Sequence, residues 1–402
     1  MEKYDKLPEF QQSLEEIVRE GARKMLHQAI ESEVEEFIKK YKGSKDEEGR
    51  MLVRRNGYLP ERKIQTGVGP IAVKKPRVRG ERFTSALLPK YMRRAPSIDA
   101  LIPALYLKGI STGNMNEALV AILGDHAKGL SPTNIARLTK IWEEEYQEWS
   151  KRNLSEKDYI YFWVDGIYFN VRLSNDRPCL LVIIGALANG TKEVVSIYDG
   201  ERESKLSWKT VLQDLKSRGL RQGPKLSIGD GALGFWAAVE EEFPGCRHQR
   251  CWVHKTANVL DKMAKSVQVN AKSMIHDMYM ADTKKEGVKA MNRFISLYEV
   301  KYPKACKCLK KDEESLFTFY DYPAEHWQHI RTTNPIESTF ATIRHRSRQT
   351  KGCGSRTATL SMVFKLSLSA ESHWRKLRGS QMILKVKNGV RFKDGEEVKE
   401  AA

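Results

Sequence analysis

Cysteine, an export signal and long apolar runs are scarce or missing in this chain of 402 residues. Six cysteines are too few for a disulfide framework, which makes the reducing cytoplasm the expected compartment. The longest apolar run, Leu180 to Ala188, is half of what a bilayer needs, and Met1 to Lys6 contain no hydrophobic signal-peptide core. The sequence thus argues against a membrane protein and predicts an intracellular one.

Acidic residues are also in deficit, with 51 Asp and Glu against 69 Lys and Arg, so the net charge is +18. This excess predicts a polyanionic partner, nucleic acid first and an anionic membrane surface second. A hydrophobic content of 41% is enough for real cores, so the chain is not a disordered basic tail. No internal repeat is visible, and the length suits two or three folding units.

The first hundred residues begin as a helix and then change character. Apolar residues recur at three- and four-residue steps from Leu14 to Ile38, which predicts an amphipathic helix. Short β structure is expected between residues 64 and 79. The basic residues in this region are Lys74, Lys75, Arg77 and Arg79. They are candidates for phosphate contact, although a basic run is also typical of an ordinary solvated face.

The region from 101 to 149 has the pattern of a helix-turn-helix. A helix at 114–123 is followed by a turn with two glycines, and Ser131-Pro132 is a favourable start for the next helix. That helix would present Thr133, Asn134 and Arg137 to a major groove. An ordinary helical hairpin is the alternative, because many hairpins share this pattern.

From Tyr159 the pattern becomes that of a mixed α/β sheet. The expected strands cover residues 159–164, 167–173, 180–187 and 193–198, with a further short strand at 226–228 after a helix. Residues 255 to about 323 are almost entirely helical and rich in lysine. Asn334-Pro335 begins another long helix, and a small polar tail is expected from about residue 379.

Three acidic residues are candidate metal ligands. Asp165 precedes Gly166, and Asp230 follows the short strand, so each is expected at a strand end. Taken alone, Asp165 would be a hairpin turn residue and Asp230 a helix cap. Glu337, in the sequence Asn334-Pro335-Ile336-Glu337, likewise satisfies the pattern of a capping box.

The helix that follows Glu337 has arginines on the same face. Ala341, Arg344 and Arg348 lie at offsets of 4, 7 and 11 from Glu337, and Arg346 and Lys351 are close by. This suits a metal ion at the helix start and DNA phosphates along the helix. Breaking or joining a phosphodiester requires an activated water or 3′-hydroxyl, and two Mg²⁺ ions about 3.5–4 Å apart provide this activation. Three acids that converge from separate elements would hold such ions.

Linked motifs around these acids resemble the Mutator family of transposases, including its bacterial insertion-sequence branch (the insertion sequence 256 type). The motifs are Val164-Asp165-Gly166-Ile167-Tyr168, Asp230-Gly-Ala-Leu-Gly234-Phe235, Glu241, Phe243-Pro244, Gln249, Cys251-Trp-Val-His254 and Arg331-Thr-Thr-Asn-Pro-Ile-Glu337-Ser338. The resemblance covers nearly the whole chain. Glu242 and Cys246 depart from the small residues usual in the family, at positions with no catalytic part.

The resemblance implies an RNase H-like fold with a DDE triad of Asp165, Asp230 and Glu337. It implies a mainly helical DNA-binding and assembly region over residues 1–150 and a catalytic core over 151–254 and 326–380. A helical insertion domain at 255–325 and a tail at 381–402 complete the expected layout. The resemblance gives no catalytic role to Glu240, Glu241, Glu242 and Glu325, which are expected to face solvent.

The resemblance also implies cofactors and partners. Two Mg²⁺ or Mn²⁺ ions per site are expected, with no nucleotide cofactor, and no Walker-type phosphate loop occurs in the chain. The expected partners are double-stranded DNA, namely terminal inverted repeats and target DNA, bound by a homodimer or larger assembly in the bacterial cytoplasm and nucleoid.

A cysteine and a histidine near Asp230 have several interpretations. Cys246, His248, Cys251 and His254 suggest a zinc cluster, but their spacings are too cramped for a zinc knuckle, so zinc is not expected. The pair Cys251 and His254 more plausibly orders the region beside Asp230 or touches DNA. Trp252 would either stack on an extruded base or belong to the core.

The leading functional hypothesis is a transposase that binds inverted repeats, nicks the element end and attacks a second phosphodiester with the freed 3′-hydroxyl. A structure-selective nuclease or RNA/DNA hydrolase on the same fold is the second hypothesis. A non-enzymatic DNA-binding regulator is the third, and the presence of all three acids argues against it.

Overall fold

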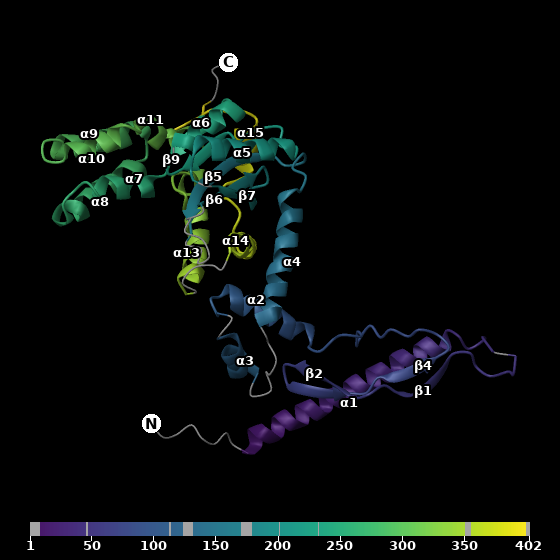
Figure 1. The fold of residues 1–402 in the computed structure, drawn as a ribbon. Helices are drawn as coiled ribbons and strands as arrows, with labels where there is room; N and C mark the ends of the chain where they lie inside the picture. The colour runs from purple at the N-terminus through teal and green to yellow at the C-terminus, as the bar shows by residue number, and fades with distance from the viewer. Residues whose placement is uncertain are drawn as a thin grey trace. The chain divides into compact units, whose positions relative to one another are not determined.

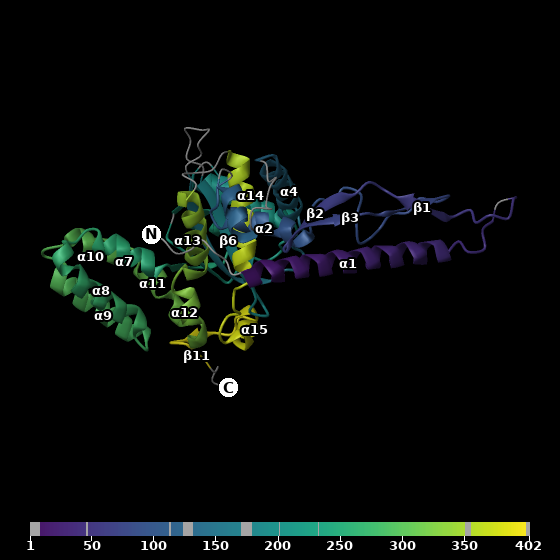
Figure 2. The same ribbon diagram turned by 90° about the horizontal axis from the view of Figure 1, so that it is seen from below.

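The structure is a computed structural model that describes residues 9–45, 47–111, 114–123, 132–169, 179–200, 202–231, 233–349 and 355–398. The chain divides into two compact units, Met1–Leu138 and Thr139–Ala402. The boundary falls within helix α4 (Pro132–Ser150). Figures 1 and 2 show the elements of each unit. No helix in the described parts of the chain is long and apolar enough to cross a membrane.

The first unit contains one long helix and two antiparallel pairs of strands. Helix α1 (Glu9–Lys39) confirms the helix expected from residues 14 to 38. Strand β2 (Arg62–Thr66) pairs with β3 (Gly69–Val73), and β1 (Arg54–Tyr58) pairs with β4 (Pro76–Arg79), both antiparallel. Alternate residues of β3 are buried, as expected for a strand with one face on a core. That core contains Ile30, Ile64, Ile71, Val73 and Leu88.

Two further helices of this unit, α2 (Pro96–Leu107) and α3 (Met115–Leu123), share a second cluster. Ile102, Met115 and Leu119 are buried there, with Leu138 of α4 packed against them. The turn required by a helix-turn-helix lies at 124–131, outside the described residues. The side chains of Thr133 and Asn134 also lie outside them, whereas Arg137 is exposed.

The second unit is built on a five-stranded mixed sheet of order β7-β6-β5-β8-β9. Strands β5 (Tyr159–Tyr168), β6 (Cys179–Leu187) and β7 (Lys192–Gly200) are antiparallel neighbours. Strands β8 (Leu226–Gly229) and β9 (Arg247–Arg250) run parallel to β5. The mixed α/β sheet expected from the sequence is therefore confirmed.

The expected break in the first strand is wrong. Residues 159 to 168 form one continuous strand, and Asp165 and Gly166 pair with Val182 and Leu181 of β6. Asp165 therefore lies inside a strand and not in a turn. Residues 170–178 are outside the described part of the chain, so the rest of the strand expected at 167–173 cannot be compared.

Helices cover both faces of the sheet. On one face α5 (Lys205–Ser217) and α6 (Leu233–Glu242) bury Trp208, Leu212 and Phe235 against Phe162 and Ile183. On the other face lie α13 (Asn334–Gln349) and α14 (Arg356–Glu371), below the sheet in Figure 1. This burial on both faces explains the near-continuous apolar sequence of β5 and β6.

The lysine-rich region forms helices as expected. They are α7 (Trp252–Leu260), α8 (Lys265–Met280), α9 (Lys284–Tyr298), α10 (Pro303–Lys310) and α11 (Glu313–Leu316). In both ribbon views α8, α9 and α10 lie to one side of the sheet (Figures 1 and 2). Their apolar faces meet one another, with Ile275, Met291, Phe294 and Leu309 buried.

The C-terminal segment is not the polar tail expected from its composition. It forms α15 (Ile383–Lys387) and a short hairpin of β10 (Phe392–Lys393) and β11 (Glu396–Glu397). Ile383 and Phe392 are buried, and the Gly395 amide donates to the Tyr320 carbonyl at 3.1 Å. The segment therefore packs on the rest of the unit through a few apolar side chains.

Candidate active site

The parallel pairing of β5 and β8 brings the two aspartates together. Tyr161 lies opposite Leu226 and Trp163 opposite Ile228, an offset of 65 positions. The same offset separates Asp165 from Asp230, so the two residues lie level with each other on adjacent strand paths. Neighbouring strands are about 4.8 Å apart. Asp230 follows the last residue of β8, where the carboxyl end of a parallel strand opens towards ligands.

A third carboxylate, Glu203, joins the aspartates and has no counterpart in the motifs. Asp165, Glu203 and Asp230 line one cavity of about 10 Å³, which is close to the space that a single water needs. Glu203 precedes Ser204, whose hydroxyl caps α5 by accepting from the Ser207 amide at 3.1 Å. The cap fixes the direction of the chain beside Asp165. The Ser-x-x-Ser pattern at residues 204–207 was the sequence signal for a helix start next to Glu203.

Gly166 provides the room for Glu203. A Cβ atom at this position would lie 2.0 Å from the Glu203 carboxylate oxygen Oε1. Gly166 therefore allows the Glu203 side chain to approach the backbone of β5 closely, and it does not form the turn expected from the sequence.

The crowding of these acids changes their proton affinity. Burial, together with the negative charge of Asp230, raises the pKa of Asp165 to about 6, against the opposing effects of His254, the Gly166 amide and Arg344. Burial also raises the pKa of Glu203 to about 7, with Asp230 and Asp165 adding to the effect. Carboxylates that repel one another are hard oxygen donors of the kind that a divalent cation prefers. The oxygens of these three do not all lie within 4.8 Å of one another, so the side chains would have to draw together around an ion.

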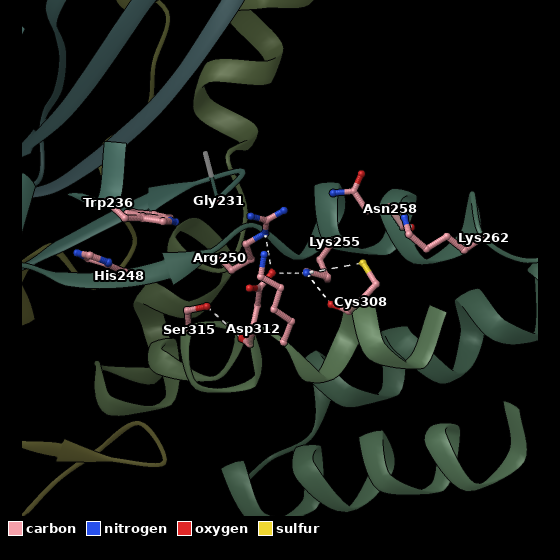
Figure 3. Close-up of a pocket in the computed structure, with 11 residues that line it drawn as sticks. Gly231, Trp236, His248, Arg250, Lys255, Asn258, Lys262, Cys308, Asp312 and Ser315 are labelled. Atoms are coloured by element: carbon pink, nitrogen blue, oxygen red, sulfur yellow. Dashed lines mark hydrogen bonds and ion pairs between the residues drawn. The ribbon is translucent and has the colours of Figure 1, made fainter. Parts of the chain in front are cut away.

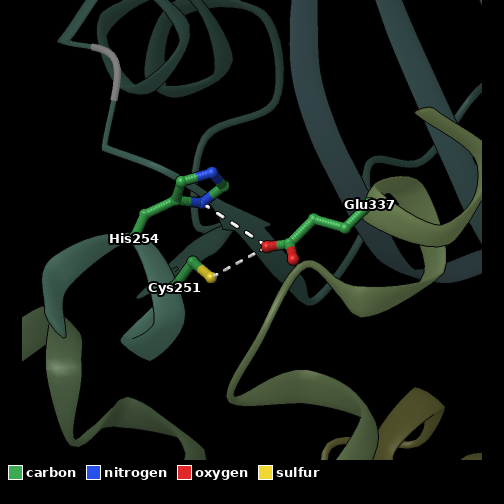
Figure 4. A group of neighbouring side chains, drawn as sticks. All are labelled: Cys251, His254 and Glu337. Atoms are coloured by element: carbon green, nitrogen blue, oxygen red, sulfur yellow. Dashed lines mark hydrogen bonds and ion pairs between the residues drawn. The ribbon is translucent and has the colours of Figure 1, made fainter. Parts of the chain in front are cut away.

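Glu337 lies at the start of α13 but is not part of a capping box. The helix begins at Asn334, and the amides of Ile336 and Glu337 donate to the Thr333 carbonyl at 2.9 and 3.0 Å. The Glu337 carboxylate accepts a hydrogen bond from the Thr333 hydroxyl at 2.9 Å. Its Oε1 atom lies 3.8 Å from His254 Nδ1 and 4.0 Å from Cys251 Sγ (Figure 4).

Cys251 and His254 connect the strand ends to this helix. Cys251 follows β9, and its amide donates to the carbonyl of Gly229, the residue before Asp230, at 2.7 Å. The Thr333 amide and hydroxyl both donate to the buried Cys251 Sγ at 3.3 Å. A hydrogen bond with Cys251 raises the pKa of His254 to about 9, and the charges of Cys251, Asp165 and Glu337 contribute. A cationic imidazole thus interacts with two of the three predicted acids.

The three acids of the predicted triad are not gathered into one cage. Asp165 and Asp230 share a cavity with Glu203, whereas Glu337 is held with Cys251 and His254. Across the described ranges, the one trio of potential metal-binding atoms within 4.8 Å of one another is Cys251, His254 and Glu337. His254 is the group whose electrostatic interactions reach both sets.

The cysteines and histidines of the considered zinc cluster lie in different places. Cys246 Sγ is 3.0 Å from the Ser227 hydroxyl, and the His248 ring stacks on Trp236 with centroids 4.5 Å apart. Only Cys251 and His254 of the four converge, and their third neighbour is Glu337.

Two of the predicted DNA contacts are wrong because the side chains are buried. Trp252 is 0% exposed, donates its indole N–H to the Leu316 carbonyl at 2.8 Å and packs on Tyr279 and Phe317. It is a core residue and presents no face to a base. Arg346 is 2% exposed, so it lies inside the protein and does not face phosphates.

Other predicted contacts are compatible with a DNA surface. Arg344 is exposed, stacks over Phe340 at 5.6 Å and lowers the pKa of Asp165 by its charge. The Arg348 side chain and Lys351 lie outside the described residues. In the first unit Lys74, Arg77 and Arg79 are exposed, while Lys75 is half-buried over Phe83 and burial lowers its pKa.

The small β1–β4 ladder places like charges side by side. Arg54 lies directly opposite Arg79, an arrangement that costs stability when nothing neutralises it. Exposed arginines in this position are suited to a polyanion.

A basic cavity that the motifs do not predict adjoins the aspartates. It has a volume of about 450 Å³ and includes Gly231, Trp236, Arg250, Lys255 and Lys262 in its lining (Figure 3). Asp312 is its carboxylate, bonded to Lys255 and 3.6 Å from Arg250. The Arg250 guanidinium lies against Gly231, where a Cβ would be 1.1 Å from Nη1. The excess of cations suits phosphate groups that pass next to Asp230.

Comparison with known proteins identifies the family of the chain. The profile "Transposase, Mutator family" matches residues 2–377. The chain is 47% identical over 281 residues to the transposase for insertion sequence element IST2 of Acidithiobacillus ferrooxidans, covering 70% of this chain and 95% of that protein. It is 47% identical over 295 residues to the transposase for IS6120 of Mycolicibacterium smegmatis, covering 73% and 91%.

A more distant relative matches over more of the chain. The transposase for IS256 in transposon Tn4001 of Staphylococcus aureus is 27% identical over 381 residues, covering 92% of this chain and 95% of that protein. By class the protein is a transposase, an enzyme that processes DNA. The chain belongs to the Mutator family of transposases.

Proposed function

We propose that the protein is a DDE-type transposase that binds the terminal inverted repeats of an insertion sequence and cleaves a strand at the element end. Cleavage would be metal-dependent hydrolysis, and the freed 3′-hydroxyl would join another phosphodiester. The observation that carries this proposal is the level pairing of Asp165 and Asp230 on β5 and β8, with Glu203 in the same cavity. The mixed sheet supports an RNase H-like core with this pairing at its centre.

Asp165 and Asp230, assisted by Glu203, would hold a divalent cation, Mg²⁺ or Mn²⁺. When bound, such ions activate a water or 3′-hydroxyl and stabilise the charge of an in-line displacement. The acids whose pKa is raised would lose their protons on binding the cation, because its positive charge would stabilise their ionised form. Glu337 would be the third member of the triad and would be a ligand for a second ion.

The neighbouring cations would position the DNA. Protonated His254, whose charge interacts with Asp165 and Glu337, would donate a hydrogen bond to a phosphate oxygen. Arg344 on α13 and the basic cavity around Arg250 would bind the strand on either side of the scissile bond. The +18 net charge supports a long electrostatic footprint on DNA.

The remaining parts of the chain would select and assemble the ends. Residues 1–150 are proposed to bind the inverted repeats, with residues 255–325 as an insertion domain between core segments 151–254 and 326–380, ahead of the tail at 381–402. A homodimer or larger assembly in the bacterial cytoplasm would hold paired ends and target DNA.

The test is incubation of purified protein with a labelled element end, target DNA and Mg²⁺. A nick at the element end and a covalent joint with target DNA are expected, and both should disappear when the metal is chelated. Nicks without joints would identify a nuclease on the same fold, and selective binding without either product would identify a regulator.

A further inference from the structure

Three side chains beside the aspartate cavity hold potential metal-binding atoms close together. Cys251 Sγ, His254 Nδ1 and Glu337 Oε1 lie within 4.8 Å of one another (Figure 4). The sulfur is 4.0 Å and the nitrogen 3.8 Å from the same Glu337 oxygen. Two atoms bound to one tetrahedral zinc ion are roughly 3.5 Å apart, because Zn–N and Zn–S bonds are about 2.1 and 2.3 Å long. The sulfur and the nitrogen therefore each need to approach the Glu337 oxygen by only about half an ångström to share one ion with it.

We propose that Cys251, His254 and Glu337 form a binding site for a thiophilic divalent cation of the zinc class. Thiolate and imidazole are donors that zinc prefers, whereas Mg²⁺ favours oxygen ligands and retains its waters. Three protein ligands leave a fourth position for water. The ion would bind Cys251 as the thiolate and His254 as the neutral imidazole, so any protons that these ligands carry would be released to solvent on binding. This set differs from the considered cluster with Cys246 and His248, because the carboxylate comes from a distant helix.

The surroundings of the three ligands suit such an ion. Cys251 is fully buried and held from both sides. Its amide donates a hydrogen bond to the Gly229 carbonyl, and the Thr333 amide and hydroxyl donate to its sulfur. His254 and Glu337 have side chains 34% and 30% exposed, which leaves a path from solvent. The Thr333 hydroxyl lies 3.3 Å from Sγ, 3.4 Å from Nδ1 and 2.9 Å from Oε1. It touches all three ligand atoms and is placed to orient them.

Zinc bound here would inhibit cleavage, because it would withdraw Glu337 from the triad that the aspartates need. This consequence rests on the proposed function, whereas binding of the ion does not. The two sites would differ in their metals, with Mg²⁺ on the oxygen ligands of Asp165 and Asp230 and zinc on the mixed ligands of the trio.

The experiment uses the full-length protein with Co²⁺ as a coloured substitute for Zn²⁺. A thiolate-to-cobalt absorption band is expected, which Zn²⁺ abolishes by displacement. The variant Cys251→Ser should lose the band, whereas Cys308→Ser, at a partly exposed cysteine on α10, should keep it. Thr333→Val should weaken binding roughly 10- to 100-fold, and Glu337→Gln should weaken it by more than about tenfold. Circular dichroism checks that each variant is folded.

Absence of the band in the wild-type protein, or its persistence in Cys251→Ser, would overturn the proposal. If Cys251→Ser does not fold, Thr333→Val and Glu337→Gln decide, since unchanged affinity in both would also exclude the site. Inhibition is measured separately as Zn²⁺-dependent loss of cleavage at fixed Mg²⁺, and binding without inhibition would overturn the regulatory part. A protein that cleaves no DNA under any condition would contradict the proposed function and leave the cobalt result valid.

Discussion

Glu203 reaches the two aspartates because Gly166 has no side chain to hold it away. The result is three carboxyl groups around a space of about 10 Å³ with no lysine or arginine in its lining. Such a group is unfavourable when all three are ionised, since each charge raises the free energy of the others. A bound cation or retained protons must therefore neutralise part of this charge. Variants of the single acids test this requirement.

Replacement of either aspartate by asparagine should abolish strand cleavage. Asp165→Asn and Asp230→Asn keep the size of the side chain but remove a charge that a divalent ion needs, so cleavage should fall at least ~10³-fold. Binding to the element end should persist, as measured by gel shift. Glu240→Gln is the matched control, because Glu240 is an exposed acid on α6. Near-normal cleavage by either aspartate variant would remove that residue from the site.

Glu203→Gln should change how stability depends on pH. The folded protein raises the pKa of Glu203 from 4.5 to about 7, so its contribution to stability is present below pH 4.5 and is lost as the pH rises through about 7. Glutamine does not titrate. At about pH 8 without metal, the variant should be more stable than the wild type by up to about 3 kcal/mol.

Urea denaturation at about pH 4.5 and pH 8 measures this difference. Added Mg²⁺ should reduce it at the higher pH, because the ion stabilises the ionised wild-type site. An equal response of the two proteins to pH would show that Glu203 does not share the charge of the cavity.

At the level of elements, helix α13 has one face suited to metal and DNA and another face that packs in the protein interior. Glu337 and Arg344 are seven residues apart and lie on a common face, whereas Arg346 follows Arg344 by two positions and is rotated by about 200°. This rotation explains why Arg344 is exposed and Arg346 is buried. The arginines of the sequence pattern are therefore not equivalent for DNA.

Arg344→Ala should weaken DNA binding and reduce its dependence on salt. Loss of one phosphate contact lowers the slope of log K against log salt by about 1. The matched control is Arg221→Ala, an exposed arginine before β8, at the end of that strand opposite to Asp230. Fluorescence anisotropy at several salt concentrations measures both variants, and equal slopes would exclude a phosphate contact for Arg344.

For the whole molecule, sequence and structure agree on the classes of element more than on side-chain neighbours. The family motifs identified the transposase family, and periodicity predicted α1, the mixed sheet and the lysine-rich helices. The burial of Trp252 was one of two open alternatives, because tryptophan suits a core as well as a base-stacking surface. The burial of Arg346 could not be predicted, because arginine is almost never fully buried. Glu203 was missed because its partners, Asp165 and Asp230, are adjacent only through the pairing of β5 with β8.

Truncation tests the division of the chain. The expected DNA-binding region ended at residue 150, but the last part of α4 packs on the second unit. The Tyr146 hydroxyl donates to the Ile197 carbonyl at 2.8 Å, and Trp149 lies 5.1 Å from Phe364. A fragment of residues 132–402 should therefore fold and keep metal binding while losing selection of inverted repeats.

A fragment of residues 151–402 should be much less stable, since removal of one large buried aromatic costs about 3–5 kcal/mol. Urea denaturation compares the two fragments, and competition between repeat and random DNA measures selectivity. Retained selectivity in the 132–402 fragment would show that the first unit does not read the repeats.

Trp236 lines both the aspartate cavity and the basic cavity, with the His248 imidazole stacked on its indole. One tryptophan side chain therefore contacts both the proposed metal site and the proposed phosphate site. Binding of a metal ion or of DNA should alter the fluorescence of Trp236. Replacement of Trp236 by phenylalanine identifies the contribution of Trp236 to the total fluorescence. The enzyme thus contains an intrinsic optical reporter that allows the order of metal and DNA loading to be followed without a label.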